Sequence, residues 1–211
     1  MDWTIEFDKA IEQYLPDLEV LQDEPMSRHT TFRIGGPAKR MAFPSSREQL
    51  VLLMSFAKNY GANPLVIGNG SNLLVPDEGL DRLVIDTSAN LNRVERGSEN
   101  TVLADAGATL ARTADLACKS GLTGLEFAHG IPGSLGGGVF MNAGAYDGEM
   151  AQVIAWVDCL DETGAPHRLA GADLALGYRT SLFEQHPDWC VLSATVRLQP
   201  GDSAAILAEM Q

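Results

Sequence analysis

The sequence is poor in cysteine and histidine. Its 211 residues include three cysteines, which lie far apart and form no C-x-x-C pair. A disulfide framework or a cysteine-bound zinc is therefore not expected, and a reducing cytoplasm is the natural compartment. The four histidines are equally scattered and show no metal-binding spacing. We expect no bound metal ion.

Basic residues and long apolar runs are also scarce. Fifteen lysines and arginines stand against 28 aspartates and glutamates, which gives a formal net charge of −13 at pH 7. Nucleic acid and anionic membranes are not expected as partners, because binding them requires clustered positive charge. No apolar run has the length of a membrane span, and no secretory signal is visible at the N-terminus. An anionic small ligand is still compatible with this charge, since backbone N–H groups can bind phosphate.

Apolar periodicity predicts a mixed α/β (α+β) chain. The predicted helices are 5–15, 45–61 and 109–120, and the predicted strands are 31–34, 38–43, 64–67, 83–85, 101–106, 153–160 and 191–198. Ser45 and Glu48 have the spacing of a capping box at the start of the second helix, and Gly61 is placed to end it. The polar residues 23–31 are expected to form a loop.

The first glycine-rich segment, I-G-N-G-S-N-L-L-V at 67–75, follows a predicted strand. It begins like a dinucleotide-binding fingerprint, but Leu73 occupies the position of the third glycine and no helix start follows, which disfavours a Rossmann site. Gly68 and Gly70 permit positive φ, so successive N–H groups can point into one concavity, and Ser71 adds a side-chain donor. Two interpretations stay open, an anion-binding loop and a polar turn between strands.

The second glycine-rich segment spans 121–148 and holds nine of the chain's 21 glycines. No G-K-[ST] follows, which excludes a nucleoside-triphosphate loop. Glycine at this density removes side chains over a broad surface and permits close approach to a flat, extended ligand. Pro132 fixes a turn, and Ser134 offers a hydroxyl beside the glycine N–H groups. We favour a ligand here over close packing of backbone on backbone.

A third feature is Arg179 in the segment Y-R-T-S-L-F at 178–183. Its guanidinium either pairs with a surface carboxylate or holds a carboxylate or phosphate of a ligand. The residues themselves leave both interpretations open.

Five motifs in this order resemble one enzyme family. They are T-T-F-R-I-G-G-P-A at 30–38, V-I-G-N-G-S-N-L-L-V at 66–75, G-L-T-G-L-E-F-A-H-G-I-P-G-S-L-G-G at 121–137, M-N-A-G-A-Y at 141–146 and Y-R-T-S-L-F at 178–183. Over about residues 24–200 the chain resembles the UDP-N-acetylenolpyruvoylglucosamine reductases, flavoenzymes that make UDP-N-acetylmuramate for bacterial cell walls.

The resemblance implies the FAD-binding fold of the vanillyl-alcohol oxidase type, with two α/β subdomains and FAD between them. We assign residues 1–88 and 89–200 to these subdomains and residues 201–211 to the start of a helix that leads to a third, substrate-binding domain. The resemblance also implies the residues that bind the cofactor. These are Arg33, Gly35, Ile67, Gly68, Asn69, Gly70, Ser71, Asn72, Leu73, Gly130, Ile131, Pro132, Gly133, Ser134, Ala143, Gly144 and Tyr146, with Gly36 near the same cofactor.

The implied reaction uses NADPH as the hydride donor and a UDP-sugar enolpyruvate as the substrate, in the cytoplasm. Arg179 inherits the catalytic arginine's position and contacts the substrate, with Tyr178 as its neighbour. Family members carry a proton-donating serine and a late glutamate beyond the point where this sequence ends, so we expect the flavin-binding portion of the enzyme. The alternatives are a non-catalytic flavin-binding module and another oxidoreductase of the same superfold.

Overall fold

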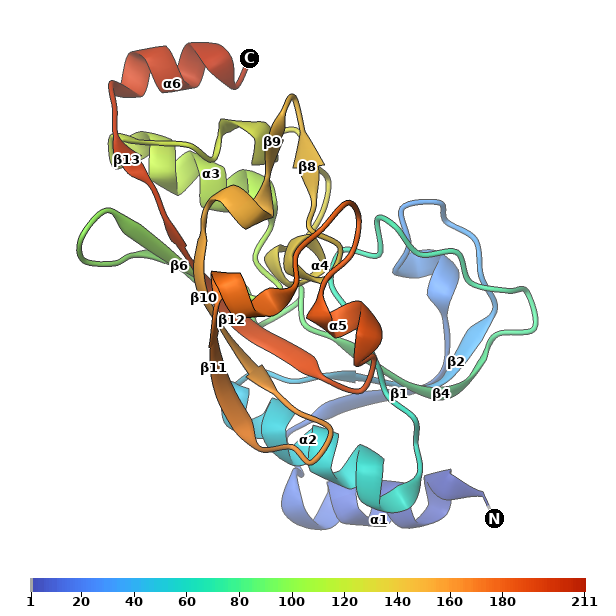
Figure 1. Ribbon diagram of the computed structural model, residues 1–211. Helices are drawn as coiled ribbons and strands as arrows, with labels where there is room; N and C mark the ends of the chain where they lie inside the picture. The colour runs from blue at the N-terminus through green and yellow to red at the C-terminus, as the bar shows by residue number, and fades with distance from the viewer. Residues whose placement is uncertain (1) are drawn as a thin grey trace. The chain divides into compact units, whose positions relative to one another are not determined.

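The computed structural model describes residues 2–211. The chain folds into two compact units, Met1–Leu91 and Asn92–Gln211 (Figure 1). The elements of the first unit are α1 (Trp3–Tyr14), β1 (Glu19–Pro25), η1 (Met26–Arg28), β2 (Pro37–Phe43), α2 (Arg47–Tyr60), β3 (Leu65–Ile67) and β4 (Leu80–Asp86). Within the described residues its strands form one four-stranded sheet in the order β1-β2-β4-β3. Strand β1 is antiparallel to β2, whereas β2, β4 and β3 run parallel.

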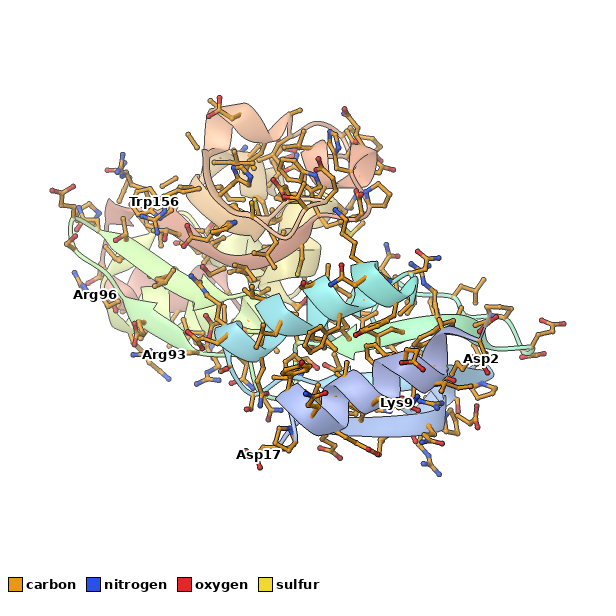
Figure 2. All side chains as sticks on the ribbon, turned by 90° about the horizontal axis from the view of Figure 1, so that it is seen from below. Asp2, Lys9, Asp17, Arg93, Arg96 and Trp156 are labelled. Carbon is orange, nitrogen blue, oxygen red and sulfur yellow. The ribbon has the colours of Figure 1, made fainter. Side chains whose placement is uncertain are left out.

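Helices α1 and α2 pack against each other, and Figure 2 shows them side by side. Helix α1 begins where the Asp2 side chain accepts a hydrogen bond from the Thr4 backbone N–H, and it buries Phe7, Ala10 and Ile11 at helical spacing. Lys9 lies on its exposed side, where it pairs with Glu6 (Figure 2). Side chains at this spacing bury one stripe of each helix and leave the opposite stripe to solvent.

Helix α2 buries Leu50, Leu53, Met54 and Ala57, and it ends at Gly61 in the left-handed conformation, as predicted. Its N-cap is one residue later than predicted. The Ser46 side chain, rather than that of Ser45, accepts from the Gln49 backbone N–H, and the Gln49 side chain in turn accepts from the Ser45 N–H. Gln49, not Glu48, is therefore the residue that bonds back to the start of the helix, and it reaches Ser45 rather than the N-cap residue Ser46, so the predicted capping box is not formed.

Two other local predictions for this unit were wrong. Residues 31–34 form no strand, because Arg33 has φ +56° and Gly35 has φ +120°, which interrupts extended backbone. Residues 23–31 are only partly a loop, since β1 continues to Pro25 and η1 follows. The strand escaped detection because its residues are polar or half-buried and because Asp23, with φ +50°, breaks the alternation.

The elements of the second unit are β5 (Val94–Arg96), β6 (Thr101–Asp105), α3 (Leu110–Lys119), β7 (Leu122–Thr123), η2 (Glu126–Ala128), α4 (Leu135–Phe140), β8 (Gly144–Ala145), β9 (Gly148–Glu149), η3 (Met150–Gln152), β10 (Ile154–Leu160), β11 (Pro166–Ala170), η4 (Gly171–Leu174), α5 (Leu182–Gln185), β12 (Cys190–Arg197), β13 (Gln199–Pro200) and α6 (Ser203–Glu209). Within the described part of the chain, its main sheet has the order β11-β10-β12-β6-β5 and is antiparallel throughout.

One hydrophobic core holds this second unit together. It joins the buried face of the sheet to α3 and α4, and Val102, Leu110, Leu135 and Val157 lie at its centre with no exposed surface. Trp156 of β10 (labelled in Figure 2) is half-buried and has the guanidinium carbons of Arg168 and Arg197 5.7 and 5.9 Å from its ring centre. Long cationic side chains thus cover the outward-facing ring.

Candidate functional site

The first glycine-rich segment leaves the sheet of the first unit at the carboxyl end of β3. Ile67, the last residue of β3, pairs with Asp86, the last residue of β4. The Ile67 carbonyl accepts hydrogen bonds from the Thr87 backbone N–H at 3.0 Å and the Thr87 hydroxyl at 2.9 Å. The loop at 68–73 therefore starts from a fixed point, at the edge of parallel strands where ligands of open α/β sheets bind.

Gly70 is the closest point of contact between this loop and the rest of the unit. It has φ +57°, and a Cβ atom placed on it would lie 2.0 Å from the His29 carbonyl oxygen. The Thr31 backbone N–H donates to the Gly70 carbonyl at 3.1 Å. Within residues 2–211, the backbone N–H groups of residues 68–71 have no hydrogen-bond acceptor. The loop thus has four successive N–H groups without a protein acceptor among the described residues, on a backbone that requires glycine at position 70; Gly68 does not adopt positive φ.

The segment predicted from Arg33 to Gly36 lies beside the far end of the same loop. A Cβ atom on Gly35 would lie 2.7 Å from Val75 Cβ, and the Gly36 N–H donates to the Pro76 carbonyl at 2.9 Å. Arg33 is exposed and has φ +56°, a conformation that non-glycine residues adopt mainly at turns and functional sites. The structure therefore brings the predicted residues of the first unit into one neighbourhood.

In the second unit, the predicted residues 130–134 lead directly into α4. Ser134 caps α4 by accepting from the Gly137 backbone N–H at 3.3 Å, and it forms a bridge with Thr109, the cap residue of α3. The Gly133 carbonyl accepts from the Leu110 N–H at 2.9 Å. A Cβ atom added to Gly130 would meet no atom within 4 Å. Hydrogen bonds therefore hold the backbone of this stretch in place, and the space beside Gly130 is open.

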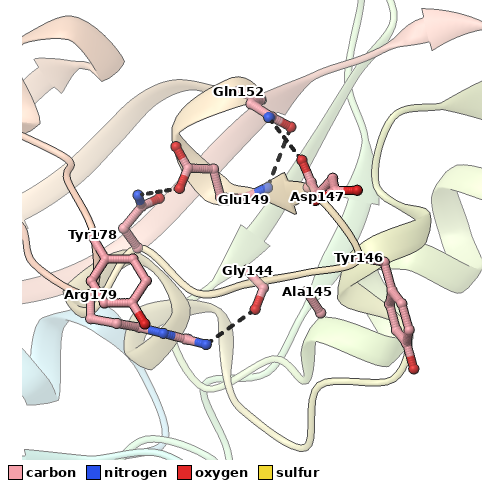
Figure 3. A pocket seen from close by; sticks show the side chains of 10 residues that line it. Gly144, Ala145, Tyr146, Asp147, Glu149, Gln152, Tyr178 and Arg179 are labelled. Carbon is pink, nitrogen blue, oxygen red and sulfur yellow. Dashed lines mark hydrogen bonds between the residues drawn. The ribbon is translucent and has the colours of Figure 1, made fainter.

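Beyond α4 the chain forms a pocket of about 270 Å³ (Figure 3). Its lining is Asn142, Gly144, Ala145, Tyr146, Asp147, Gly148, Glu149, Gln152, Tyr178 and Arg179. Four of the predicted residues, Gly144, Tyr146, Tyr178 and Arg179, thus meet in one cavity although 34 positions separate Gly144 from Tyr178. Ala143, also predicted, is buried behind it at 3% exposure.

Arg179 is exposed and its only hydrogen bond in the described residues is long. One guanidinium nitrogen, Nη2, donates to the Gly144 carbonyl at 3.4 Å. No carboxylate of residues 2–211 forms an ion pair with it, which removes the surface-pair interpretation within this part of the chain. Its φ is +56°. A guanidinium has five N–H donors, so most of them are available to a ligand.

The two tyrosines of the pocket are both 91% exposed. The ring of Tyr178 lies beside Arg179, whereas the ring of Tyr146 extends away from both (Figure 3). Tyr146 follows β8 and has φ +50°. The structure therefore presents the two rings to solvent in different directions.

Sequence reasoning missed four polar residues of the pocket, Asn142, Asp147, Glu149 and Gln152. Glu149 and Gln152 form a capping box around η3. Their E-x-x-Q spacing was available as a signal, but a three-residue 3₁₀ helix has no periodicity that would attract attention to it. Asn142 lies within the quoted motif at 141–146, and its burial could not be foreseen from its polarity.

Within residues 2–211, no three histidine, cysteine or acidic side chains gather in a way that could hold a metal ion. In the same residues, no helix combines the length and the apolar character needed to cross a membrane.

Comparison with known proteins decides the family. Residues 38–170 match the FAD binding domain family. A UDP-N-acetylenolpyruvoylglucosamine reductase of Pediococcus pentosaceus is 42% identical over 203 residues, which is 96% of this chain and 67% of that protein. One of Rubrobacter xylanophilus is 44% identical over 180 residues, or 85% of this chain and 60% of that protein. The chain belongs to the UDP-N-acetylenolpyruvoylglucosamine reductase family.

A solved structure of the family supports the same assignment. The reductase of Thermus caldophilus superimposes with a TM-score of 0.75 at 33% identity, covering 92% of this chain and 66% of that one. The expected fold, the FAD-binding fold of the vanillyl-alcohol oxidase type, is confirmed. The chain spans 60–67% of the length of the two curated reductases described above. It corresponds to the flavin-binding portion of the family.

Proposed function

We propose that this chain supplies the flavin-binding part of an NADPH-dependent reductase that converts UDP-N-acetylglucosamine enolpyruvate to UDP-N-acetylmuramate in peptidoglycan synthesis. The observation that carries the proposal is the 42–44% identity to reductases of this name along 85–96% of the chain. The match of residues 38–170 to an FAD binding domain supports the cofactor. The proposed compartment is the cytoplasm, where the nucleotide precursor and NADPH occur together.

The loop at 68–73 is the proposed site for the pyrophosphate of FAD. Its four consecutive N–H groups lack protein acceptors within residues 2–211, and Gly70 has no room for a side chain. Backbone donors of this kind bind an anion without a cationic side chain, which fits a chain of net charge −13. We assign Ile67, Asn69, Ser71, Asn72 and Leu73 to this site with Gly68 and Gly70, and Arg33 and Gly35 to its border.

The second unit is proposed to hold the remainder of the cofactor. Residues 130–134 lead into the Ser134 cap of α4, and Ala143, Gly144 and Tyr146 follow that helix. The fit rests on Gly130, where the space beside the backbone is open, so a flat ring system can approach the main chain closely. The residues present are therefore compatible with the cofactor in both units.

Bound FAD would supply hydride transfer from NADPH to the enolpyruvyl carbon of the substrate, and a proton donor would complete the reduction. The role proposed for Arg179 is electrostatic. Negative charge grows on the enolate and carboxylate of the substrate during this transfer, and a fixed guanidinium stabilises that charge more than it stabilises the ground state. Tyr178 lies beside Arg179 and is proposed to contact the same substrate (Figure 3).

An anaerobic absorbance experiment on the FAD-loaded chain tests the proposal. NADPH is added first and UDP-N-acetylglucosamine enolpyruvate second. The proposal predicts that NADPH bleaches the flavin band of this chain, and that the substrate restores the band when the family's proton-donating serine is supplied with it. A chain that binds FAD but is never bleached by NADPH would contradict the reductase and favour a non-catalytic flavin-binding module.

The variant Arg179→Ala separates the two half-reactions. In a protein that carries this chain together with the family's proton-donating serine, it is expected to slow the recovery of the flavin band after substrate addition by at least about tenfold, the effect of losing about 1.4 kcal/mol of transition-state stabilisation. Bleaching by NADPH should keep its rate, because the arginine is proposed to act only on the enolpyruvate. An equal loss in both steps would contradict the assignment of Arg179 to the substrate.

A further inference from the structure

Asn142 is the most buried polar residue of the pocket, at 2% exposure. Its Nδ2 donates to the Gly177 carbonyl at 2.9 Å and to Glu149 Oε2 at 3.1 Å, and its Oδ1 accepts from the Ala151 backbone N–H at 2.9 Å. A carboxamide has two N–H donors and one carbonyl, and here each of these groups has a partner. The three bonds also fix which end of the amide carries the nitrogen.

These hydrogen bonds join two segments that are far apart in the sequence. Gly177 begins the turn that carries Arg179, and this turn is closed by reciprocal backbone bonds between Gly177 and Thr180 at 3.1 and 3.3 Å. Glu149 and Ala151 belong to the segment that follows Gly144, whose carbonyl accepts from Arg179. Asn142 therefore links the turn that carries Arg179 to the segment that follows Gly144, the residue whose carbonyl accepts the hydrogen bond from Arg179.

Little restrains the side chain of Arg179 itself, so its orientation depends on how the turn that carries it is held. Its side chain is exposed, its one hydrogen bond in residues 2–211 is 3.4 Å long, and its φ is +56°. A long side chain on a mobile turn would sample many orientations and would stabilise a developing charge poorly. On the C-terminal side the Ser181 hydroxyl anchors the turn by donating to the Phe140 carbonyl, and on the N-terminal side Asn142 anchors it at Gly177. Electrostatic stabilisation is effective only where the donor is already oriented before the reaction.

We propose that Asn142 is the positioning residue for Arg179. It holds the turn at 177–180 against the wall of the pocket, so that the guanidinium faces the reacting substrate without reorganisation. This inference rests on the function proposed for Arg179. Asn142 itself contacts neither cofactor nor substrate in this proposal.

Asparagine suits this position for two reasons. Its φ is +44°, which asparagine and aspartate tolerate better than other non-glycine residues. Aspartate would keep the shape and the backbone, but it would replace the amide nitrogen by an oxygen that faces the Gly177 carbonyl and the Glu149 carboxylate. Glycine would keep the backbone conformation and lose all three bonds. Asn142→Asp and Asn142→Gly thus remove the tie in two different ways.

Hydrogen exchange of the FAD-loaded chain tests the tie independently of activity. In both variants, the backbone amides of Gly177 and Thr180 should exchange at least about tenfold faster than in the wild type, the effect of losing one or more buried hydrogen bonds. The amides of β12 should keep their protection. Asn100→Gly is the control, because Asn100 also has positive φ, +62°, and lies in the turn between β5 and β6 outside the pocket. Unchanged exchange at Gly177 and Thr180 would overturn the proposal.

A double-mutant cycle tests whether Asn142 acts through Arg179. In the protein that also carries the family's proton-donating serine, Asn142→Asp should slow the recovery of the flavin band after substrate addition by about tenfold or more, and it should leave bleaching by NADPH unchanged. In an Arg179→Ala background, it should add no further loss. A merely structural residue would slow both steps, or would add its full effect in either background, and that result would overturn the inference. If Arg179→Ala alone leaves the recovery unchanged, the function proposed for Arg179 fails, and the single variant shows this separately.

Discussion

Gly70→Ala is the substitution that tests most directly how the loop after β3 is built. The added Cβ would lie 2.0 Å from the His29 carbonyl oxygen, whereas an unstrained carbon–oxygen contact is about 3.3 Å. The loop must therefore move by roughly 1.3 Å, and the hydrogen bond from Thr31 to the Gly70 carbonyl is lost with it. The left-handed backbone of an L-residue costs about 1–2 kcal/mol, and the lost bond about 0.5–1.5 kcal/mol.

The combined local cost is about 2 kcal/mol or more, and it falls on the loop proposed to bind the FAD pyrophosphate. If the loop must return to its native shape to bind FAD, the dissociation constant for FAD should rise about thirtyfold. Quenching of flavin fluorescence on titration of the apoprotein measures this constant. The melting temperature, followed by circular dichroism, shows whether the variant is folded.

Gly61→Ala is the matched control in the same unit. Gly61 also has positive φ, +71°, but no atom lies within 4 Å of the added Cβ. It should therefore lower stability by about 1 kcal/mol and leave the FAD dissociation constant unchanged. The reasoning is refuted if Gly70→Ala binds FAD as tightly as the wild type, or if Gly61→Ala weakens FAD binding to the same extent.

Three further predictions concern stability and reactivity. Ser134→Ala removes the cap of α4 and should cost about 1 kcal/mol in urea unfolding; no change would contradict the capping role. Hydrogen bonds, first from the Thr163 side chain, lower the pKa of Asp161 far below its usual value. Because the pKa of Asp161 is lower in the folded chain than in the unfolded chain, its ionised carboxylate stabilises the fold at pH values above about 3.9, the pKa in the unfolded chain. Any stability advantage over Asp161→Asn should thus be lost as the pH falls below about 4, and an advantage that grows with acid would refute this sign. Burial raises the pKa of Cys159 to about 11 and that of Cys190 to about 12. Both thiols should therefore resist labelling at pH 8 until the chain is unfolded in urea, whereas rapid labelling of the native chain would show that they are accessible.

Local signals in the sequence predicted helices α1, α2 and α3 but not the short helices α4 and α5. Helix α2 ends at Gly61 because glycine adopts the left-handed conformation without strain, and that signal is visible in the sequence alone. The alternation of residues 31–34 was misleading for an equally local reason. Phe32 and Ile34 are 59% and 46% exposed, so the alternation does not mark a buried face of a sheet. Apolar alternation predicts a strand only where a core receives one of its faces.

The pocket around Arg179 was only half predictable. The motif that carries the arginine and the motif at 141–146 were both recognised, but nothing in the sequence showed that they meet. Asn142 is buried because it bonds to a carbonyl 35 positions away, and such a pairing depends on the tertiary fold rather than on local composition.

Equilibrium titration of the folded apoprotein with FAD tests the central claim most directly. The claim is that this chain binds the cofactor through its glycine-rich segments. It predicts saturable binding of one FAD per chain, with quenched flavin fluorescence and a raised melting temperature. Binding should be weakened by Gly70→Ala and not by Gly61→Ala. A folded chain that shows no saturable FAD binding would contradict the account.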